Sequence, residues 1–251
     1  MAFGWLTVGF VTLIIFNPVV GQNDTNDVLT DSSRSSEPTD CHKNMNSSKY
    51  LGEPLHTMWH STLNRSILCD VRLDGGGWIV IQRRTSRDID FRRNWTDYRD
   101  GFGSYWSSFW LGNEDIYQLT TRDFYELRID LKVQTTNLGY VLVYAHYTTF
   151  RIGSESENYA LNLGVYSGTA GEYPDCGMAY SNGQQFTTID RDNDPLNLGN
   201  CAKFLSGGGW WYKRCTCVSL NDDFNLLFWM SHVYHDPVPV VRSKMMIRKL
   251  W

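Results

Sequence analysis

Residues 190–215 read DRDNDPLNLGNCAKFLSGGGWWYKRC, which combines an acidic loop, two cysteines and a glycine triplet followed by aromatic residues. The acidic residues Asp190, Asp192 and Asp194 alternate along the chain. Their carboxylates converge only where a turn wraps them around a cation. Calcium suits such a loop, because it takes roughly six to eight oxygen ligands, accepts backbone carbonyls and tolerates irregular geometry. The pattern therefore indicates a candidate calcium site.

The spacing excludes the EF-hand as the form of this site. Counted from Asp190, the sixth position is Pro195, where an EF-hand has glycine, and the twelfth is Cys201, where it has glutamate. The remaining alternative is a solvated acidic turn. Spacing alone does not decide between such a turn and a calcium site.

The N-terminal residues have the composition of a signal peptide. Residues 1–21 carry no charged side chain and contain an apolar stretch at 8–16. Since a membrane anchor needs about 20 apolar residues, we expect a signal peptide that is cleaved ahead of Gln22, and therefore secretion. Sequons for N-glycosylation agree with export, and they are Asn23, Asn46, Asn64 and Asn94.

The next segment, residues 22–39, is a polar linker. It consists mainly of Ser, Thr, Asp, Asn and Glu, so it buries too little apolar surface to fold alone and is predicted to be disordered. It contains neither the Gly-x-y repeat of a collagen stalk nor the apolar heptads of a coiled coil. The sequence does not decide whether the chain forms oligomers, and this segment contains no recognisable oligomerisation motif.

Charge and cysteine content limit the class of partner. The chain has 23 basic and 27 acidic residues, a net charge of −4 and no basic run, which argues against a nucleic-acid partner. No sequence segment after the signal peptide is long and apolar enough to be a membrane span. Six cysteines in an exported chain predict three disulfides.

Residues 40–251 have the composition of one folded domain. They hold most of the 10 Trp, 14 Tyr and 12 Phe residues, and glycines separate their short apolar runs. Two Gly-Gly-Gly-Trp sequences, at 75–78 and 207–210, predict turns in which the backbone passes close beneath an indole. Period-two patterns predict strands over residues 77–83, 125–133, 140–150, 159–163 and 244–248, and shorter signals predict helices over 92–98 and 116–119.

Several motifs of this domain resemble one family. The acidic loop, the glycine triplet with its aromatic residues and both cysteines of 190–215 resemble the calcium and cystine loop of the fibrinogen C-terminal domain. Other sequences similar to hallmarks of that family are Asp70, 75–84 (GGGWIVIQRR), 90–91 (DF), Trp95, Tyr98, 101–103 (GFG), 109–114 (FWLGNE), 127–131 (LRIDL), 166–171 (YSGTAG), 182–183 (NG), 186–188 (FTT) and 246–248 (MIR). The resemblance covers roughly residues 40–251. It implies a disulfide-bonded, fibrinogen C-terminal-like globular domain of the α+β class, with a mixed and mainly antiparallel sheet, short helices and long loops.

The same resemblance implies a ligand set for the calcium ion. The ligands would be the side chains of Asp192 and Asp194 and the backbone carbonyls of Leu196 and Leu198, with Asp190 in a supporting role. The loop between Asp194 and Cys201 is one residue longer than in the family's pattern. The side-chain ligands are therefore the firmer part of this prediction.

The resemblance also implies two of the three disulfides. It pairs Cys41 with Cys69 and Cys201 with Cys215. The remaining two cysteines, Cys176 and Cys217, fall outside the family's pattern and pair by elimination. An intermolecular bridge through one or both of them is the alternative.

The lectin-like branch of the family, the ficolins and tachylectins, binds acetyl groups in a pocket beside the calcium ion. The resemblance implies that the amides of Arg214 and Cys215 are donors here, across a peptide bond that is often cis in the family, and that Phe204, Tyr212 and Phe224 form the walls. Such a pocket matches an acetamido group, which offers one carbonyl and one methyl. The alternative is that Phe204 and Tyr212, together with Trp210 and Trp211, belong to the core, because aromatic residues beside glycines are commonly buried.

The chain departs from the lectin pattern near this pocket. Thr216 stands where the family usually has histidine, Cys217 is additional, and the segment 224–229 is shorter than usual. The shorter segment removes part of the loop that normally closes the pocket. The shortened segment slightly favours a flat polar surface without an acetyl pocket, as expected for a protein-binding ligand.

The function predicted from the sequence is binding, because enzyme motifs are absent. The chain contains no Gly-x-Ser-x-Gly, no phosphate loop with lysine and no His-Glu-x-x-His. We expect a secreted, calcium-binding, lectin-like glycoprotein that recognises glycans or acetylated groups in innate immune pattern recognition. The alternative is a protein ligand of the angiopoietin-like or fibrinogen-like type, which acts through a receptor, the extracellular matrix or a clot.

Overall fold

The computed structural model describes residue 41 and residues 55–172, 176–234 and 237–250. All of these residues belong to one compact unit, residues 37–251. The predicted signal peptide, the predicted linker and the sequons at Asn23 and Asn46 lie outside the described residues. No helix among the described residues is long and apolar enough to cross a membrane.

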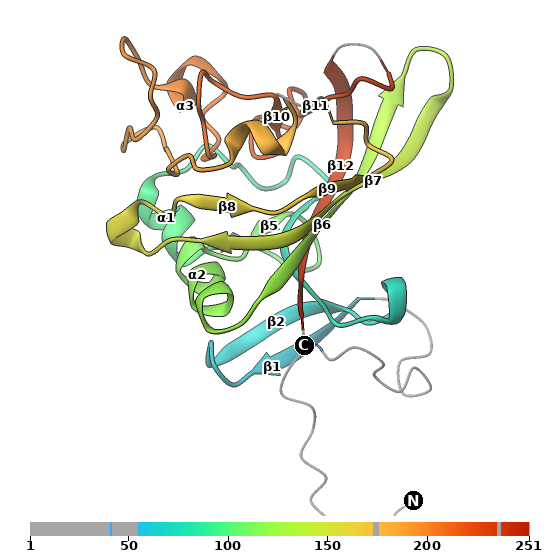
Figure 1. Ribbon diagram of the computed structural model, residues 1–251, viewed down its shortest axis with the longest axis vertical. Helices are drawn as coiled ribbons and strands as arrows, with labels where there is room; N and C mark the ends of the chain where they lie inside the picture. Colours follow the sequence, from blue (N-terminus) through green and yellow to red (C-terminus); the bar gives the residue numbers. More distant parts are fainter. Residues whose placement is uncertain (1–40, 42–54, 173–175, 235–236, 251) are drawn as a thin grey trace, which may run out of the picture. The chain divides into compact units, whose positions relative to one another are not determined.

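A central antiparallel sheet forms the framework of the domain, and β12 runs through its middle (Figure 1). The strand order is β1-β2-β3-β12-β6-β7-β8. In that order the strands are Leu55–His60, Arg65–Asp70, Trp78–Arg84, Pro237–Lys249, Tyr125–Thr135, Gly139–Ile152 and Leu161–Leu163. The shorter strands β4 (Phe102–Gly103), β5 (Phe109–Trp110), β9 (Tyr166–Gly168), β10 (Val218–Ser219) and β11 (Phe228–Met230) pair beside it. The predicted α+β fold with a mainly antiparallel sheet is therefore confirmed.

The helices are short and lie between strands. The α-helices are α1 (Trp95–Asp100), α2 (Asn113–Arg122) and α3 (Cys201–Phe204), and the 3-10 helices are η2 (Leu73–Gly75), η3 (Glu155–Glu157) and η4 (Met178–Ser181). Helix α2 packs against β7 and against α1. The loops that carry α3, β10 and β11 gather on one side of the sheet, at the top of Figure 1.

Alternation along β6 divides the sheet into two faces. Its odd-numbered residues from 127 to 133 are buried, whereas Arg128, Asp130 and Lys132 between them are partly exposed. Successive side chains of a strand point to opposite faces, and the register with β7 and β12 continues this division. We call the face with the buried residues the core face and the face with these three charged residues the outer face.

Aromatic residues fill the core between the helices and the C-terminal loops. The ring of Phe186 lies 5.1 Å from that of Trp211 and 5.2 Å from that of Tyr98, measured between centroids. All three side chains are fully buried. Offset and edge-to-face aromatic pairs of this kind contribute about 0.5–1.5 kcal/mol each beyond their area burial, so this cluster stabilises the loops as well as the sheet.

The two glycine triplets bring the backbone close to different segments of the chain. Gly76 has a φ of 79°, and a Cβ there would lie 2.5 Å from the carbonyl oxygen of Val71, so this position accepts only glycine. A Cβ at Gly208 would lie 2.2 Å from the carbonyl oxygen of Asn221. The second triplet therefore allows a close approach to a neighbouring loop. The passage of the backbone beneath an indole stays a prediction.

The structure contains three disulfides. They join Cys41 to Cys69, Cys176 to Cys217 and Cys201 to Cys215, with Cα–Cα distances of 5.7, 5.4 and 5.3 Å. These are the pairs expected from the sequence. The pair that was assigned by elimination forms within one chain, so both of its thiols are used without an intermolecular bridge.

Candidate functional site

The acidic loop begins with Asp190, which is tied to helix α1. Its Oδ1 accepts hydrogen bonds from the backbone N–H of Trp95 at 2.9 Å and from the hydroxyl of Thr188 at 2.6 Å. The N-cap residue of α1, Asn94, makes no side-chain capping bond. Asp190 thus supplies an acceptor at the N-terminus of α1, where a carboxylate is favourable. Asp190 therefore anchors the loop, and its supporting role at a calcium site stays a prediction.

Arg191 makes a second connection between the loop and its surroundings. Its guanidinium lies 3.9 Å from the ring centroid of Trp95, donates to Oδ1 of Asn158 at 2.6 Å and lies 3.6 Å from Glu155. The indole N–H of Trp95 donates to the same Glu155 carboxylate at 2.7 Å. The first half of the acidic loop is therefore held to α1 and η3 by one connected group of side chains.

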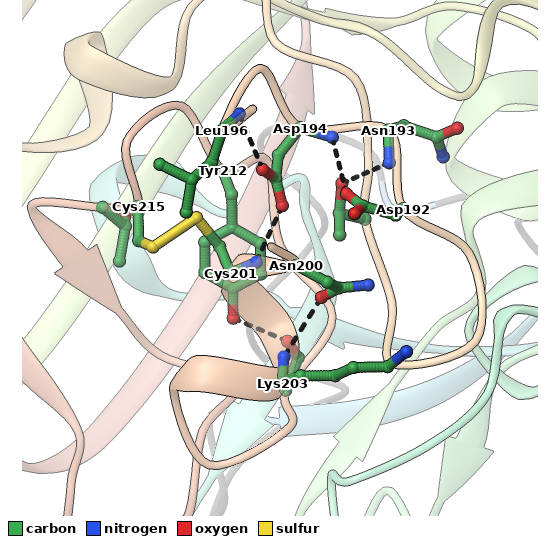
Figure 2. Close-up of a disulfide and its surroundings, with 12 residues drawn as sticks. Asp192, Asn193, Asp194, Leu196, Asn200, Cys201, Lys203, Tyr212 and Cys215 are labelled. Carbon is green, nitrogen blue, oxygen red and sulfur yellow. Dashed lines mark hydrogen bonds between the residues drawn. A yellow bond between two sulfur atoms is a disulfide. The ribbon is translucent and has the colours of Figure 1, made fainter. Parts of the chain in front are cut away.

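Asp192 and Asp194 lie next to each other at the tip of the loop. Both carboxylate oxygens of Asp194 accept backbone N–H groups, Oδ1 from Leu196 at 3.0 Å and Oδ2 from Cys201 at 2.9 Å (Figure 2). Asp192 accepts the N–H of Asp194 at 3.3 Å. Burial raises the pKa of the Asp194 carboxyl, the two backbone N–H groups oppose this, and the charge of Asp192 adds to the rise. A cation between the two carboxylates would relieve their repulsion.

The ligand set that these residues offer fits calcium. Among the described residues, no three His, Cys, Asp or Glu side chains come together in a metal-binding cluster. A metal held by Asp192 and Asp194 must therefore draw its other ligands from backbone carbonyls and water, which calcium accepts readily. The carbonyl of Leu196 accepts the N–H of Gly199 at 3.4 Å, and the side chain of Leu198 is 94% exposed. The calcium site stays a prediction.

Cys201 and Asn200 hold the far end of the loop. Cys201 is bonded to Cys215. The Oδ1 of Asn200 accepts the N–H of Lys203 at 3.1 Å, which caps α3 (Figure 2). The Nδ2 of Asn200 donates to the carbonyl of Thr188 at 2.9 Å. Both ends of the acidic loop are thus anchored to the rest of the domain.

The predicted wall residues of the acetyl pocket do not share one environment. Tyr212 is 1% exposed, and its hydroxyl donates to the carbonyl of Gly208 at 2.6 Å, so it is part of the core. Phe204 is 64% exposed. Its ring lies against Gly199, where an added Cβ would come within 2.1 Å of it. Phe224 is partly buried and belongs to the rim of the core.

The predicted donors of that pocket are available. Among the described residues, the backbone N–H groups of Arg214 and Cys215 meet no acceptor, while the carbonyl of Cys215 accepts the N–H of Lys213 at 2.7 Å. The described chain contains no cis peptide bond, so the expected cis bond between these two residues is not found. Arg214 and Lys213 are both exposed.

The two described sequons lie where a glycan can be attached. Asn64 is exposed in the turn between β1 and β2, with a φ of 50°. Asn94 is exposed directly ahead of α1. Glycosylation at both stays a prediction.

The sequence analysis did not identify Arg84, a buried residue that contacts the loop around Asp222. Arg84 of β3 is 1% exposed, its guanidinium lies 3.8 Å from the ring centroid of Phe91, and it donates to the carbonyl of Asp222 at 2.9 Å. Burial lowers the pKa of Arg84 to about 10, although Tyr98 and Asp222 oppose the change. The bond from Arg84 to Asp222 joins residues 138 positions apart, so no local pattern signals it.

Comparison with known proteins gives a family for this fold. The family model of the fibrinogen beta and gamma chains, C-terminal globular domain, matches residues 37–235. Tenascin-R of Gallus gallus is 39% identical over 188 residues, which are 71% of this chain and 13% of tenascin-R. Human angiopoietin-related protein 1 is 48% identical over 145 residues, which are 58% of this chain and 28% of that protein. The chain thus spans less than a third of the length of these two relatives.

Solved structures agree with the sequence comparison. The fibrinogen-like globe domain of human ANGPTL6 superposes with a TM-score of 0.72 and 32% identity, covering 83% of this chain and 95% of that domain. Lamprey fibrin D-dimer, solved with a Gly-His-Arg-Pro-amide peptide ligand, gives a TM-score of 0.64 and 28% identity, covering 80% of this chain and 71% of that one. The chain belongs to the family of fibrinogen C-terminal globular domains.

Proposed function

We propose that the chain is a secreted recognition protein that binds an extracellular protein partner and catalyses no reaction. The binding surface would be the loop face, which we define as Leu198, Phe204, Lys213 and Arg214. Leu198 and Phe204 flank Gly199 and the capped start of α3, while Lys213 and Arg214 precede the cysteine that is bonded to Cys201.

The observation that carries this proposal is an exposed apolar pair on a fixed frame. Leu198 is 94% exposed and Phe204 is 64% exposed, although the loop beneath them is held by a disulfide and by the hydrogen bonds of Asp194. Burial of such a side chain at an interface contributes about 1.5–3 kcal/mol. A preformed frame reduces the entropy lost on binding. The peptide ligand of lamprey fibrin D-dimer supports a protein or peptide partner for this chain.

Binding of labelled protein to cultured cells tests this proposal. The double variant Leu198→Ala and Phe204→Ala should lose most of the binding, because it removes the apolar pair without touching the core. The matched control is Leu138→Ala with Phe124→Ala, since these two side chains are 71% and 77% exposed and lie outside the loop face. Trypsin treatment of the cells should abolish binding, and glycosidase treatment should leave it. Equal loss in both double variants, or binding that only glycosidases remove, would contradict the proposal.

The second candidate function is recognition of an acetyl group. The free N–H groups of Arg214 and Cys215 favour it, because two adjacent donors can hold one carbonyl oxygen. Retention on beads that carry acetylated sugar, with release by a calcium chelator, would support this candidate and the calcium site together. If the protein stays on the beads in the presence of chelator, acetyl recognition does not depend on calcium. If the protein is not retained at all, acetyl recognition is refuted.

A further inference from the structure

The outer face of the sheet carries a groove of about 430 Å³, and none of its lining residues belongs to the loop face. Six cationic side chains are among its lining residues, and three of these are Arg84, Arg128 and Lys244. The other three lie on three neighbouring strands and form the cation cluster: Arg83 of β3, Arg242 of β12 and Lys132 of β6. Leu142 and Tyr144 of β7 form its apolar side. The groove therefore combines positive charge with an apolar wall.

The sheet register places the three cations close together. Arg242 lies directly opposite Lys132 on β6. Arg83 lies opposite Lys244, two residues along β12 from Arg242. Burial lowers the pKa of Arg83, and the charge of Arg242 lowers it further. Like charges opposite each other destabilise a sheet, so the isolated fold gains nothing from this arrangement.

The carboxylates of the outer face do not neutralise these three cations. Asp130 lies 2.7 Å from Arg128 and 3.5 Å from Lys244, and Asp70 lies 2.8 Å from Lys244. The other two carboxylates have partners as well: Asp74 pairs with Arg128, and Glu126 pairs with Arg248 and His146. All four acids are thus engaged outside the cluster.

The three cations have no carboxylate partner among the described residues. Arg83 is partly buried and donates one hydrogen bond, to the carbonyl of Tyr105 at 2.9 Å. The ammonium of Lys132 lies 4.6 Å from the ring centroid of Tyr140. Arg242 is exposed. Most of their donors are therefore free to meet an anion.

We propose that this groove binds a sulfated glycan chain. Adjacent strands lie about 4.8 Å apart, so the cations of β3, β12 and β6 spread over about 10 Å, which is wider than one sulfate group. Guanidinium groups bind such oxyanions through paired hydrogen bonds. Leu142, which is 79% exposed, offers an apolar contact that a sugar ring can use and a hydrated inorganic ion cannot. The site shares no residue with the loop face and does not depend on its function.

The topology favours a glycan over an acidic peptide. Extended peptides commonly bind by adding a strand to a free sheet edge. Here β12 pairs with β3 and β6, and β6 pairs with β12 and β7, so the strands beneath the groove have no free edge. The whole chain has a net charge of −4, so a polyanion is not attracted by overall charge and must find this local cluster.

Affinity of the full chain for a heparin dodecasaccharide, measured by surface plasmon resonance over a range of NaCl concentrations, tests the proposal. Arg242→Gln with Lys132→Gln should weaken binding by at least about tenfold, as expected for the loss of two charge-assisted contacts. Arg83→Gln should weaken it separately. The control Arg87→Gln with Arg151→Gln removes the same charge from two exposed sites outside the groove and should bind like the wild type. A calcium chelator should change nothing, which separates this site from the loop face.

Four results would overturn the proposal. Failure of the wild type to bind the dodecasaccharide at 0.1 M NaCl, roughly the ionic strength at which surface charges still act over about 10 Å, would remove its basis. Equal weakening in both double variants would show that bulk charge alone is measured. Equal binding of polyglutamate would indicate a site for acidic peptides, and equal displacement by millimolar sodium sulfate would indicate a site for single anions. Thermal unfolding of each variant shows that it is folded before its affinity is compared.

Discussion

Glu172 is a buried carboxyl that forms no ion pair with another described residue, and its replacement by glutamine should change how stability depends on pH. The residue is 7% exposed. Its Oε1 accepts the hydroxyl of Tyr147 at 3.0 Å and the N–H of Ala179 at 2.6 Å. Burial raises the pKa of Glu172 to about 7, although these two hydrogen bonds oppose the rise. Glutamine keeps the oxygen acceptor and removes the charge.

The direction of the effect follows from the two pKa values. The carboxyl titrates near 4.5 when unfolded and near 7 when folded, so its contribution is fully present below pH 4.5 and is lost as the pH rises through 7. A difference of one between the two pKa values corresponds to about 1.4 kcal/mol. The difference of about 2.5 here gives a loss of about 3 kcal/mol between pH 4.5 and pH 8. Glu172→Gln should not suffer this loss.

Urea unfolding of both proteins without reductant, at pH 4.5, 6 and 8, measures this change. The free energy of unfolding of Glu172→Gln minus that of the wild type should rise by about 3 kcal/mol from the lowest to the highest pH. Glu157→Gln is a control of opposite sign, because the carboxylate of Glu157 accepts the N–H and the hydroxyl of Ser154, which lower its pKa. The free energy of unfolding of that variant minus that of the wild type should therefore fall as the pH rises. A difference for Glu172→Gln that stays constant with pH would refute the reasoning.

Three further changes test the fold and the metal site. Replacing Cys176 and Cys217 together by alanine should lower the free energy of unfolding by roughly 4 kcal/mol on the chain-entropy model, measured by urea unfolding. Gly208→Ala should cost about 1–3 kcal/mol, because the added Cβ would lie 2.2 Å from the carbonyl oxygen of Asn221; an unchanged free energy of unfolding would show that this close approach is unimportant. Calcium should raise the Tm of the wild type, and Asp192→Asn should reduce the rise.

The sheet was predictable where one face of a strand is buried and the other is not. In β6 and β7 the period-two pattern is clear, and both strands are found where the pattern places them. β12 begins at Pro237, seven residues before the predicted strand over 244–248. Its prolines hid it, because proline lacks the N–H donor of a sheet. This end pairs with the short β11 instead of the centre of the sheet.

The disulfides of the candidate site could be predicted from the sequence, but the packing of its side chains could not. Two disulfides followed from the family resemblance, and the third followed by elimination among the six cysteines. The burial of Tyr212, which turns a predicted pocket wall into a core residue, depends on a carbonyl that the glycine triplet brings to its hydroxyl. The attachment of Asp190 to α1 spans 95 residues. That attachment arises only when the loop packs against the helix, so the sequence around Asp190 contains no sign of it.

The two proposed binding surfaces rest on different parts of the fold, and this makes them separable. The loop face is shaped by the disulfide of Cys201 and by the hydrogen bonds of Asp194, whereas the outer-face groove is shaped by strands whose ladders need neither. Mild reduction that opens the bond between Cys201 and Cys215 while the sheet stays folded should therefore abolish binding to cells and leave heparin binding unchanged. Far-ultraviolet circular dichroism shows whether the sheet has survived. Loss of both activities from a protein whose sheet is intact would mean that the two surfaces are coupled.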